Sequence, residues 1–193
     1  MDRVKMKVLA LAYNSLSRTG AYALVLSDEE DKVRVPVIIG MAEAQAIVVQ
    51  LEGVKVKRPL THDIIKELTG RLGVDLEEVV IYRVEDGVFY AEAFFCRGED
   101  EIIKIDIRTS DAVALALRYK CPIYMKKSVI DQVGISASTF EMKGMKSTGR
   151  HGDNLELLSD EELERLMDEA VQNEDYEQAS RYRDMLKSRK EKP

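Results

Sequence analysis

The sequence has few cysteines, no long hydrophobic run and no excess of positive charge. Its only two cysteines, Cys96 and Cys121, lie in apolar stretches without the spacing of metal ligands. This argues against a cysteine-ligated metal site and favours two buried thiols in a reducing compartment. No apolar segment reaches the ~20 residues of a membrane span, and the N-terminus alternates lysine with apolar residues rather than forming a secretory leader. We therefore predict a cytoplasmic protein that does not cross a membrane.

The charge is unevenly divided along the chain. Residues 1–150 carry 22 Lys/Arg and 22 Asp/Glu, whereas residues 151–193 carry 7 and 13, so the tail holds the whole net charge of −6. A neutral body argues against tight binding of duplex nucleic acid without sequence preference, because such binding draws most of its affinity from a basic surface. A local basic patch remains compatible with this composition.

Alternating and apolar patterns predict an α+β fold. We expect strands over 4–13, 21–26, 33–39, 78–84, 88–96 and 101–107, with helices over 41–52, 61–73, 109–119 and 128–133. Asp86-Gly87 between two strand patterns predicts a tight hairpin. Pro122 predicts that residues 122–124 form a short edge strand, because proline cannot donate to a sheet. Strands and helices do not alternate regularly, so the sheet is expected to be mostly antiparallel or mixed, with packed helices.

The C-terminal part differs from the rest of the chain in composition and hydrophobic pattern. Residues 136–158 are rich in Ser, Thr, Gly, Met and Lys without an apolar period, which is typical of a linker. Ser159 with Glu162, and Asp175 with Gln178, have the spacing of helix caps and precede two amphipathic patterns. We predict a main domain over 1–135, a linker over 136–158 and a two-helix hairpin over 159–190 that needs a partner surface.

Two polar runs carry most of the chemistry. Residues 58–63 (Arg-Pro-Leu-Thr-His-Asp) and 106–111 (Asp-Ile-Arg-Thr-Ser-Asp) each stand where a strand or loop pattern ends and a helix is expected to begin. Free N–H groups and the positive end of the dipole make a helix start suitable for anions. If the two runs meet in space, they bring carboxylates, guanidinium groups and an imidazole together for phosphate chemistry. If they do not meet, they are two helix caps, with Thr61 as the first cap.

The candidate site residues fall into groups by their chemistry. The expected metal ligands, for Mg²⁺ or Mn²⁺, are Glu43, Asp63, Asp106 and Asp111. The expected catalytic residues are His62, Asp106 and Asp111. Substrate is expected to contact Arg58, Arg108, Gln45 and Ser110. Each residue also has a structural alternative: the acids and threonines would cap helices, and Glu43 would form an ion pair with Arg58 or Arg108.

Five ordered motifs resemble the bifunctional nuclease family. They are residues 40–47 (GMAEAQAI), 51–53 (LEG), 58–63 (RPLTHD), 86–91 (DGVFYA) and 106–116 (DIRTSDAVALA), and the likeness covers about residues 4–135. Residues 163–187 resemble the UVR motif of nucleotide excision repair proteins and some chaperone ATPases, although Ser180 and Tyr182 replace the commoner Ala and Leu. The first resemblance implies hydrolysis of RNA and DNA without assigning catalytic residues, and the second implies a protein-binding hairpin.

Three hypotheses remain open on the sequence. The first is a metal-dependent nuclease that acts on RNA and DNA. The second is a non-catalytic module that binds a phosphorylated or nucleic-acid ligand and recruits a partner through residues 159–190. The third is a structural oligomer assembled through the hairpin and apolar strand edges, and we expect a homo-oligomer in any case. Whether the two polar runs form one open cleft is the observation that separates the first two.

Overall fold

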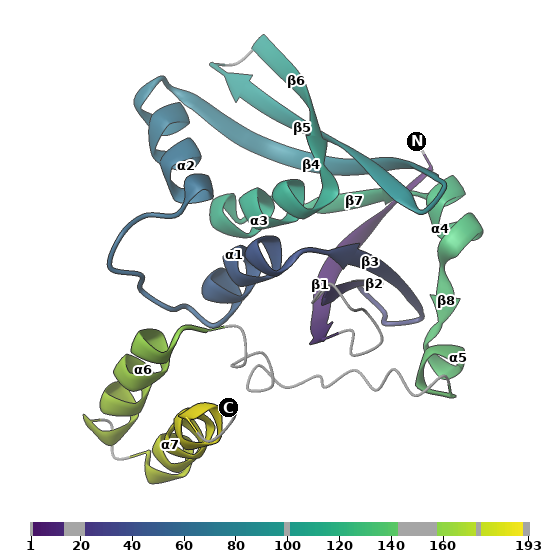
Figure 1. Cartoon of the computed structure of the whole chain (residues 1–193). Coiled ribbons are helices and arrows are strands. Elements are labelled where there is room, and N and C mark those ends of the chain that lie inside the picture. Colours follow the sequence, from purple (N-terminus) through teal and green to yellow (C-terminus); the bar gives the residue numbers. More distant parts are fainter. Residues whose placement is uncertain (1, 14–21, 99–100, 143–157, 173–174, 191–193) are drawn as a thin grey trace.

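The computed structural model has an eight-stranded mixed sheet, helices packed against it and a C-terminal helical hairpin (Figure 1). It describes residues 2–13, 22–98, 101–142, 158–172 and 175–190. This architecture confirms the predicted α+β class. Among the described residues, no helix combines the length and the hydrophobicity needed to cross a bilayer.

The sheet has the strand order β6-β5-β4-β7-β1-β2-β3-β8, and β4 and β7 are its one parallel pair among the described strands. The strands are β1 (Arg3–Tyr13), β2 (Tyr22–Asp28), β3 (Val33–Ile39), β4 (Val74–Glu85), β5 (Val88–Arg97), β6 (Glu101–Arg108), β7 (Ile123–Lys126) and β8 (Ile135–Ser136). The helices are α1 (Met41–Leu51), α2 (Thr61–Arg71), α3 (Thr109–Tyr119), α4 (Lys127–Val133), α5 (Ala137–Met142), α6 (Asp160–Gln172) and α7 (Tyr176–Lys190).

The β4–β5 hairpin turns where the sequence predicts it. Glu85 pairs with Val88, and the two residues between them, Asp86 and Gly87, have φ angles of 50° and 79°. Both angles lie in the left-handed region that a tight two-residue hairpin requires and that Asp-Gly tolerates well. The prediction of this hairpin is confirmed.

The position of β7 corrects the prediction of an edge strand. β7 lies inside the sheet, parallel to β4 on one side and antiparallel to β1 on the other. Pro122 precedes the strand, and its carbonyl accepts a hydrogen bond from the Val79 N–H at 3.1 Å. The prediction was wrong because Pro122 lies one residue before β7 begins. At that position its missing N–H removes no hydrogen bond from the sheet, so the strand can be an interior one.

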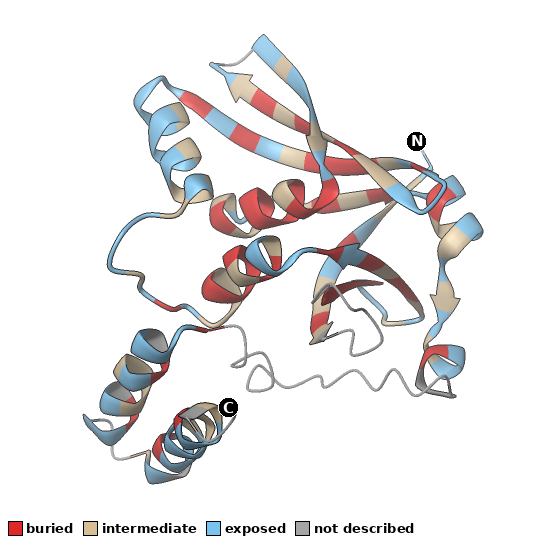
Figure 2. Ribbon diagram, viewed as in Figure 1, coloured by how far each residue is buried: buried red, intermediate tan, exposed pale blue. Residues whose placement is uncertain are grey.

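Helix α3 is the centre of the helical layer. It lies across β4, β5 and β6, and both α1 and α2 pack against it. Its buried alanines, Ala112, Ala114 and Ala116, allow the neighbouring backbones to approach closely. Figure 2 shows α3 almost entirely buried, whereas α2 is largely exposed. The starts of these three helices are therefore held by a rigid central element.

Part of the segment predicted as a linker is structured. Ser136 belongs to β8, which pairs with β3, and α5 follows at once. Phe140 of α5 is 2% exposed and packs in a small cluster with Ala10 and Val25. The remainder of the predicted linker up to residue 157, including His151, lies outside the described residues.

Helices α6 and α7 form the expected hairpin. Asp175 caps α7, since its Oδ1 accepts the Gln178 N–H at 3.1 Å. Leu163 and Leu186 are buried and belong to the same hydrophobic cluster as α1. Lys57, in the α1–α2 connection, forms an exposed ion pair with Glu161 of α6 at 2.8 Å. The hairpin therefore rests beside the connection that leads into α2 (Figure 1).

Both cysteines are free and half-buried. Loss of hydration on burial raises the pKa of the Cys121 thiol to about 11. A thiol with that pKa stays protonated at neutral pH, so it is a poor nucleophile and metal ligand.

Candidate active site

Three helices begin at the same place in the fold. α1 starts after Gly40, α2 after Leu60 and α3 after Arg108, and each of these preceding residues has an extended backbone. Local sequence explains each start: Gly40 ends β3, Pro59 enforces an extended approach to α2, and β6 runs directly into α3. First-turn residues of all three helices line one cavity, and the N–H groups and positive dipole end of a helix start favour an anion nearby.

The first turns of these helices line a cavity of about 550 Å³, which we call the His62 pocket. Its apolar lining consists of Ala42, Ala46, Leu60, Ile65, Ile107 and Leu115. Its polar lining consists of Glu43, Gln45, Thr61, His62, Arg108 and Asp111. The two polar runs of the sequence therefore meet in one open site rather than forming separate helix caps.

Arg108 is the electrostatic centre of this pocket. Its Nε donates to Asp111 Oδ2 at 2.7 Å, its Nη2 donates to Asp111 Oδ1 at 3.2 Å, and its Nη1 donates to Glu43 Oε1 at 3.0 Å. The hydrogen bonds and negative charge of Asp111, followed by those of Glu43, raise the pKa of the guanidinium, so it stays cationic. The Arg108 side chain is 68% exposed, which leaves it accessible to a ligand.

His62 and Asp111 form a hydrogen-bonded pair. His62 Nε2 lies 3.1 Å from Asp111 Oδ1, and the two side chains are 12% and 21% exposed. When Nε2–H donates to the carboxylate, Nδ1 carries the lone pair of the neutral ring. This is the arrangement in which an acid orients a histidine for proton transfer.

Gly40 allows Glu43 to fold back over the start of α1. A Cβ atom added to Gly40 would lie 2.5 Å from Glu43 Oε2, closer than real Cβ contacts. The backbone of Gly40 has a φ of −77°, which any residue adopts, so a larger residue there would act only by displacing the end of the Glu43 side chain. The Glu43 carboxylate is thus held between Gly40 and Arg108.

The structure brings some of the predicted site residues together and places others elsewhere. Glu43, Gln45, His62, Arg108 and Asp111 all line the His62 pocket. The others lie outside its lining. Arg58 is exposed in the α1–α2 connection, Ser110 is buried at the start of α3, Asp106 is exposed 3.5 Å from the Tyr82 hydroxyl, and Asp63 lines a neighbouring pocket.

The carboxylates of the His62 pocket limit how a metal ion would bind. Among the described residues, no three His, Cys, Asp or Glu side chains form a ready metal-binding cluster. Glu43 and Asp111 nevertheless supply two carboxylates on the same guanidinium. Mg²⁺ is commonly held by one or two carboxylates, with water and substrate phosphate completing its shell. The donor set fits that mode and does not fit a closed protein cage.

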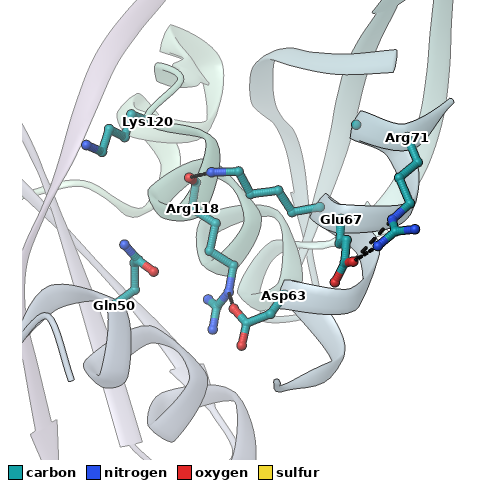
Figure 3. A pocket seen from close by; sticks show the side chains of 8 residues that line it. Gln50, Asp63, Glu67, Arg71, Arg118 and Lys120 are labelled. Carbon is teal, nitrogen blue, oxygen red and sulfur yellow. Dashed lines mark hydrogen bonds and ion pairs between the residues drawn. The ribbon is translucent and has the colours of Figure 1, made fainter. Parts of the chain in front are cut away.

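Arg118 is an important residue that the sequence reasoning missed. Its side chain is 2% exposed; Nε donates to Asp63 Oδ1 at 2.6 Å, and Nη1 donates to the carbonyls of Ala46 and Ala114 (Figure 3). The available signal was its place seven residues after Asp111, on the same side of a mostly apolar helix. Asp63 Oδ2 also accepts the Leu60 N–H at 2.8 Å. This bond and the helix start at Thr61 correct the prediction that Thr61 is the N-cap.

Replacing Asp63 with asparagine is expected to destabilise the protein by about 3 kcal/mol. The substitution leaves the Arg118 charge buried without its counter-ion, and the value is at the low end for such losses because Asp63 is 31% exposed. Urea unfolding measures the change in the free energy of unfolding.

Glu67→Gln is the matched control, since its partner Arg71 is on the surface and such pairs contribute ~0–1 kcal/mol. A double variant, Asp63→Asn with Arg118→Met, should recover about 1 kcal/mol or more. Equal losses from Asp63→Asn and Glu67→Gln would contradict the expectation.

The same ion pair makes stability depend on acid pH. Desolvation raises the pKa of Asp63, but the hydrogen bonds from Arg118 and Leu60 outweigh it and hold the pKa below its ordinary value of 3.8. A carboxyl whose pKa is depressed on folding stabilises the protein above its unfolded pKa and loses that contribution as the pH falls through the folded pKa. Unfolding measured from pH 6 downward should therefore show a smaller acid-dependent loss in Asp63→Asn than in the wild type.

Comparison with known proteins identifies the family. The family model described as "Bifunctional nuclease domain" matches residues 24–138, and the model described as "UvrB/uvrC motif" matches residues 161–192. An uncharacterized protein of Mycobacterium tuberculosis is 42% identical over 112 residues, which cover 58% of this chain and 66% of that protein.

Plant relatives extend the similarity over most of the chain. "Bifunctional nuclease 1" of Oryza sativa subsp. indica is 25% identical over 178 residues, and "Bifunctional nuclease 2" of Arabidopsis thaliana is 26% identical over 178 residues. These alignments cover 86% and 85% of this chain but 54% of each relative, so the chain spans about half the length of the plant proteins. With a nuclease-domain match over more than half of its length, the chain belongs to the bifunctional nuclease family and carries a UVR motif at its C-terminal end.

Proposed function

We propose that the protein hydrolyses phosphodiester bonds in RNA and DNA, in single-stranded or flexible segments. The observation that carries the proposal is the convergence of three helix N-termini and Arg108 on a pocket that also holds a His62–Asp111 pair. Helix starts and a guanidinium attract a phosphate, and a histidine oriented by a carboxylate transfers protons. The plant relatives named bifunctional nucleases support the same reaction.

The residues of the His62 pocket supply distinct parts of this reaction. Arg108 binds the oxygens of the phosphodiester and stabilises the charge that they gain in the transition state. His62 Nδ1 takes a proton from a water molecule, whose oxygen forms the new bond to phosphorus. The bond from phosphorus to the leaving sugar oxygen then breaks, and that oxygen takes a proton from the imidazolium or from water. Asp111 keeps the ring in the required tautomer and stabilises its positive form.

A divalent cation is part of the proposal. Glu43 and Asp111 would hold Mg²⁺ or Mn²⁺ together with water and substrate phosphate. The ion would lower the pKa of a bound water and neutralise charge on the phosphoryl group. Titration with Mn²⁺ monitored by calorimetry tests this ligand role without depending on activity. Glu43→Gln is compared with Glu92→Gln, an acid of similar exposure that also pairs with a cation but lies outside the His62 pocket.

One observation favours the binding module as the second candidate function. Among the described residues no preassembled metal cluster exists, and Arg108 is already engaged by two carboxylates. A site of this kind binds a phosphate without activating water. The UVR hairpin would then connect the bound ligand to a protein partner.

Cleavage assays distinguish the two candidates. The full chain is incubated with labelled single-stranded RNA and DNA after treatment with EDTA, and then with added Mg²⁺ or Mn²⁺. We expect the single-stranded RNA and the single-stranded DNA both to be cut. The cleavage rate should fall at least tenfold without metal and return when metal is restored. Binding of the strands with no cleavage under any of these conditions would reject the nuclease and support the module.

We also propose that the protein binds a partner, forms a homo-oligomer and acts in the cytoplasm. The α6–α7 hairpin would dock another protein, and its exposed Val171 and Tyr176 provide apolar contact area. The unpaired edge of β6, with Ile102 72% exposed, would contribute to a homo-oligomer. We propose that these interactions take place in the cytoplasm.

A further inference from the structure

A second polar cavity lies beside the His62 pocket, between the same three helices. We call it the Arg118 pocket; its volume is about 590 Å³, and Gln50 of α1, Lys66 of α2, Arg118 of α3 and Lys120 contribute to its lining. Gln50 follows Glu43 by seven residues, and Arg118 follows Asp111 by seven. Seven residues of α-helix advance about 10 Å. The two pockets therefore lie one after the other along α1 and α3, and we call the two together the groove.

The hydrogen-bonding capacity of this pocket is not filled by the protein. Asp63 is committed to Arg118, Glu67 is committed to Arg71, and the Lys66 ammonium donates to the Arg118 carbonyl. Among the described residues, Arg118 Nη2 has no hydrogen-bond partner although the side chain is 2% exposed. Figure 3 shows Gln50 and Lys120 on one side of Arg118 and the Glu67–Arg71 pair on the other. A ligand with acceptor oxygens on the Gln50 side would meet the side chains of Gln50 and Lys120, and the buried Arg118 guanidinium beneath them would attract it by charge.

The charge of the pocket also favours an anion. Its lining holds four cationic side chains and two carboxylates, which gives a net charge of +2. The carboxyl ends of α1 and α3 contribute about half a negative elementary charge each. The side-chain charges exceed this helix contribution, so a positive potential remains. Lys120 adds to it directly because, within the described part of the chain, no ion pair is formed by its ammonium group.

We propose that the Arg118 pocket binds a backbone phosphate of the same single strand whose scissile phosphate occupies the His62 pocket. This inference rests on the proposed function and adds a second contact to it. Residues 1–150 carry equal numbers of basic and acidic side chains, so in this proposal the strand is held by separate phosphate contacts along the groove. A flexible single strand can follow such a groove between helices, whereas a rigid duplex requires a wide basic surface.

Lys120→Glu, measured on substrates of two lengths, tests the inference. Lys126→Glu is the matched control, since Lys126 is an exposed lysine at the end of β7 and outside this pocket. On a long single strand, Lys120→Glu should raise KM about five- to tenfold with kcat within about twofold, and it should reduce the salt dependence of binding by about one phosphate contact. On a dinucleoside monophosphate, which has no second phosphate, wild type and Lys120→Glu should behave alike.

The remaining outcomes are equally decisive. Equal effects of Lys120→Glu on both substrate lengths, or no effect on either, would overturn the inference while leaving the proposed nuclease intact. A third outcome would also overturn the inference: a free mononucleotide competes with the substrate in the wild type but not in Lys120→Glu, while the effect of the substitution is the same for both substrate lengths. That result would assign the pocket to a free phosphate ligand. If the wild type binds long strands without cutting them, the same length and salt dependence measured by fluorescence anisotropy would support the second phosphate site although the proposed catalysis fails.

Discussion

Replacing His62 with alanine is expected to lower kcat for strand cleavage by about 10²- to 10⁴-fold, the usual contribution of a general base or acid. The reason is that His62 is the one histidine of the His62 pocket and is held by Asp111 at 3.1 Å. KM should change little, because the lost interaction belongs to the transition state. Steady-state kinetics on labelled RNA and DNA strands measure both quantities.

Two further variants separate proton transfer from structural support. His62→Gln retains a donor to Asp111 but cannot accept a proton, so we expect it to be nearly as inactive as His62→Ala. Asp106→Asn should keep most of its activity, because Asp106 lies 3.5 Å from the Tyr82 hydroxyl and outside the pocket lining. A fully active His62→Gln, or an inactive Asp106→Asn that remains folded, would contradict this assignment of the site.

Replacing Arg108 with alanine is expected to lower kcat about 10²- to 10³-fold. Removal of a donor aimed at developing charge has this size of effect, and Arg108 is the exposed cation of the His62 pocket. Arg108→Lys should show an intermediate loss, because an ammonium group keeps the charge but not the planar fork of donors. The measurement is the same steady-state assay, with the strand at a concentration well above its KM.

Arg83→Ala is the control for Arg108. Arg83 is an exposed arginine of β4 that stacks 3.9 Å from the Tyr90 ring centre and pairs with Glu85, outside the lining of the His62 pocket. Its removal should leave cleavage unchanged. Partial recovery of Arg108→Ala by added guanidinium ion would show that the missing group acts on the substrate. Equal activities of Arg108→Ala and Arg83→Ala would exclude Arg108 from catalysis.

Much of this site follows from local sequence signals. Pro59 and the alternation that ends at Arg108 mark the starts of α2 and α3, and acids and a histidine at those positions indicate an anion site. The Asp-Gly turn fixes the β4–β5 hairpin because both residues must adopt positive φ angles. The helix starts and the hairpin are confirmed because each depends on a few neighbouring residues whose backbone preferences are strong, whereas the anion site stays a prediction.

Other features depend on contacts between distant residues and could not be read locally. Asp63 was expected among the metal ligands, but the side chain turns to Arg118, a partner 55 residues away. Asp106 and Asp111 are five positions apart, yet one is exposed beside Tyr82 and the other lines the His62 pocket. The third helix start, after Gly40, joins the site only because α1 packs against α3. Tertiary packing decides these placements, and one sequence contains no direct record of it.

The interior position of β7 has a consequence for how the chain matures on the ribosome. This four-residue strand joins β1, whose residues 3–6 pair with residues 123–126, to β4 in the other half of the sheet. More than a hundred residues must therefore be synthesised after β1 before β7, its second partner strand, is available. Pairing between segments so distant in the sequence is slow. Until residue 126 has left the exit tunnel, β7 cannot join the two halves of the sheet. We therefore expect α1, which follows β3, and α3, which follows β6, to pack into their final arrangement late in synthesis.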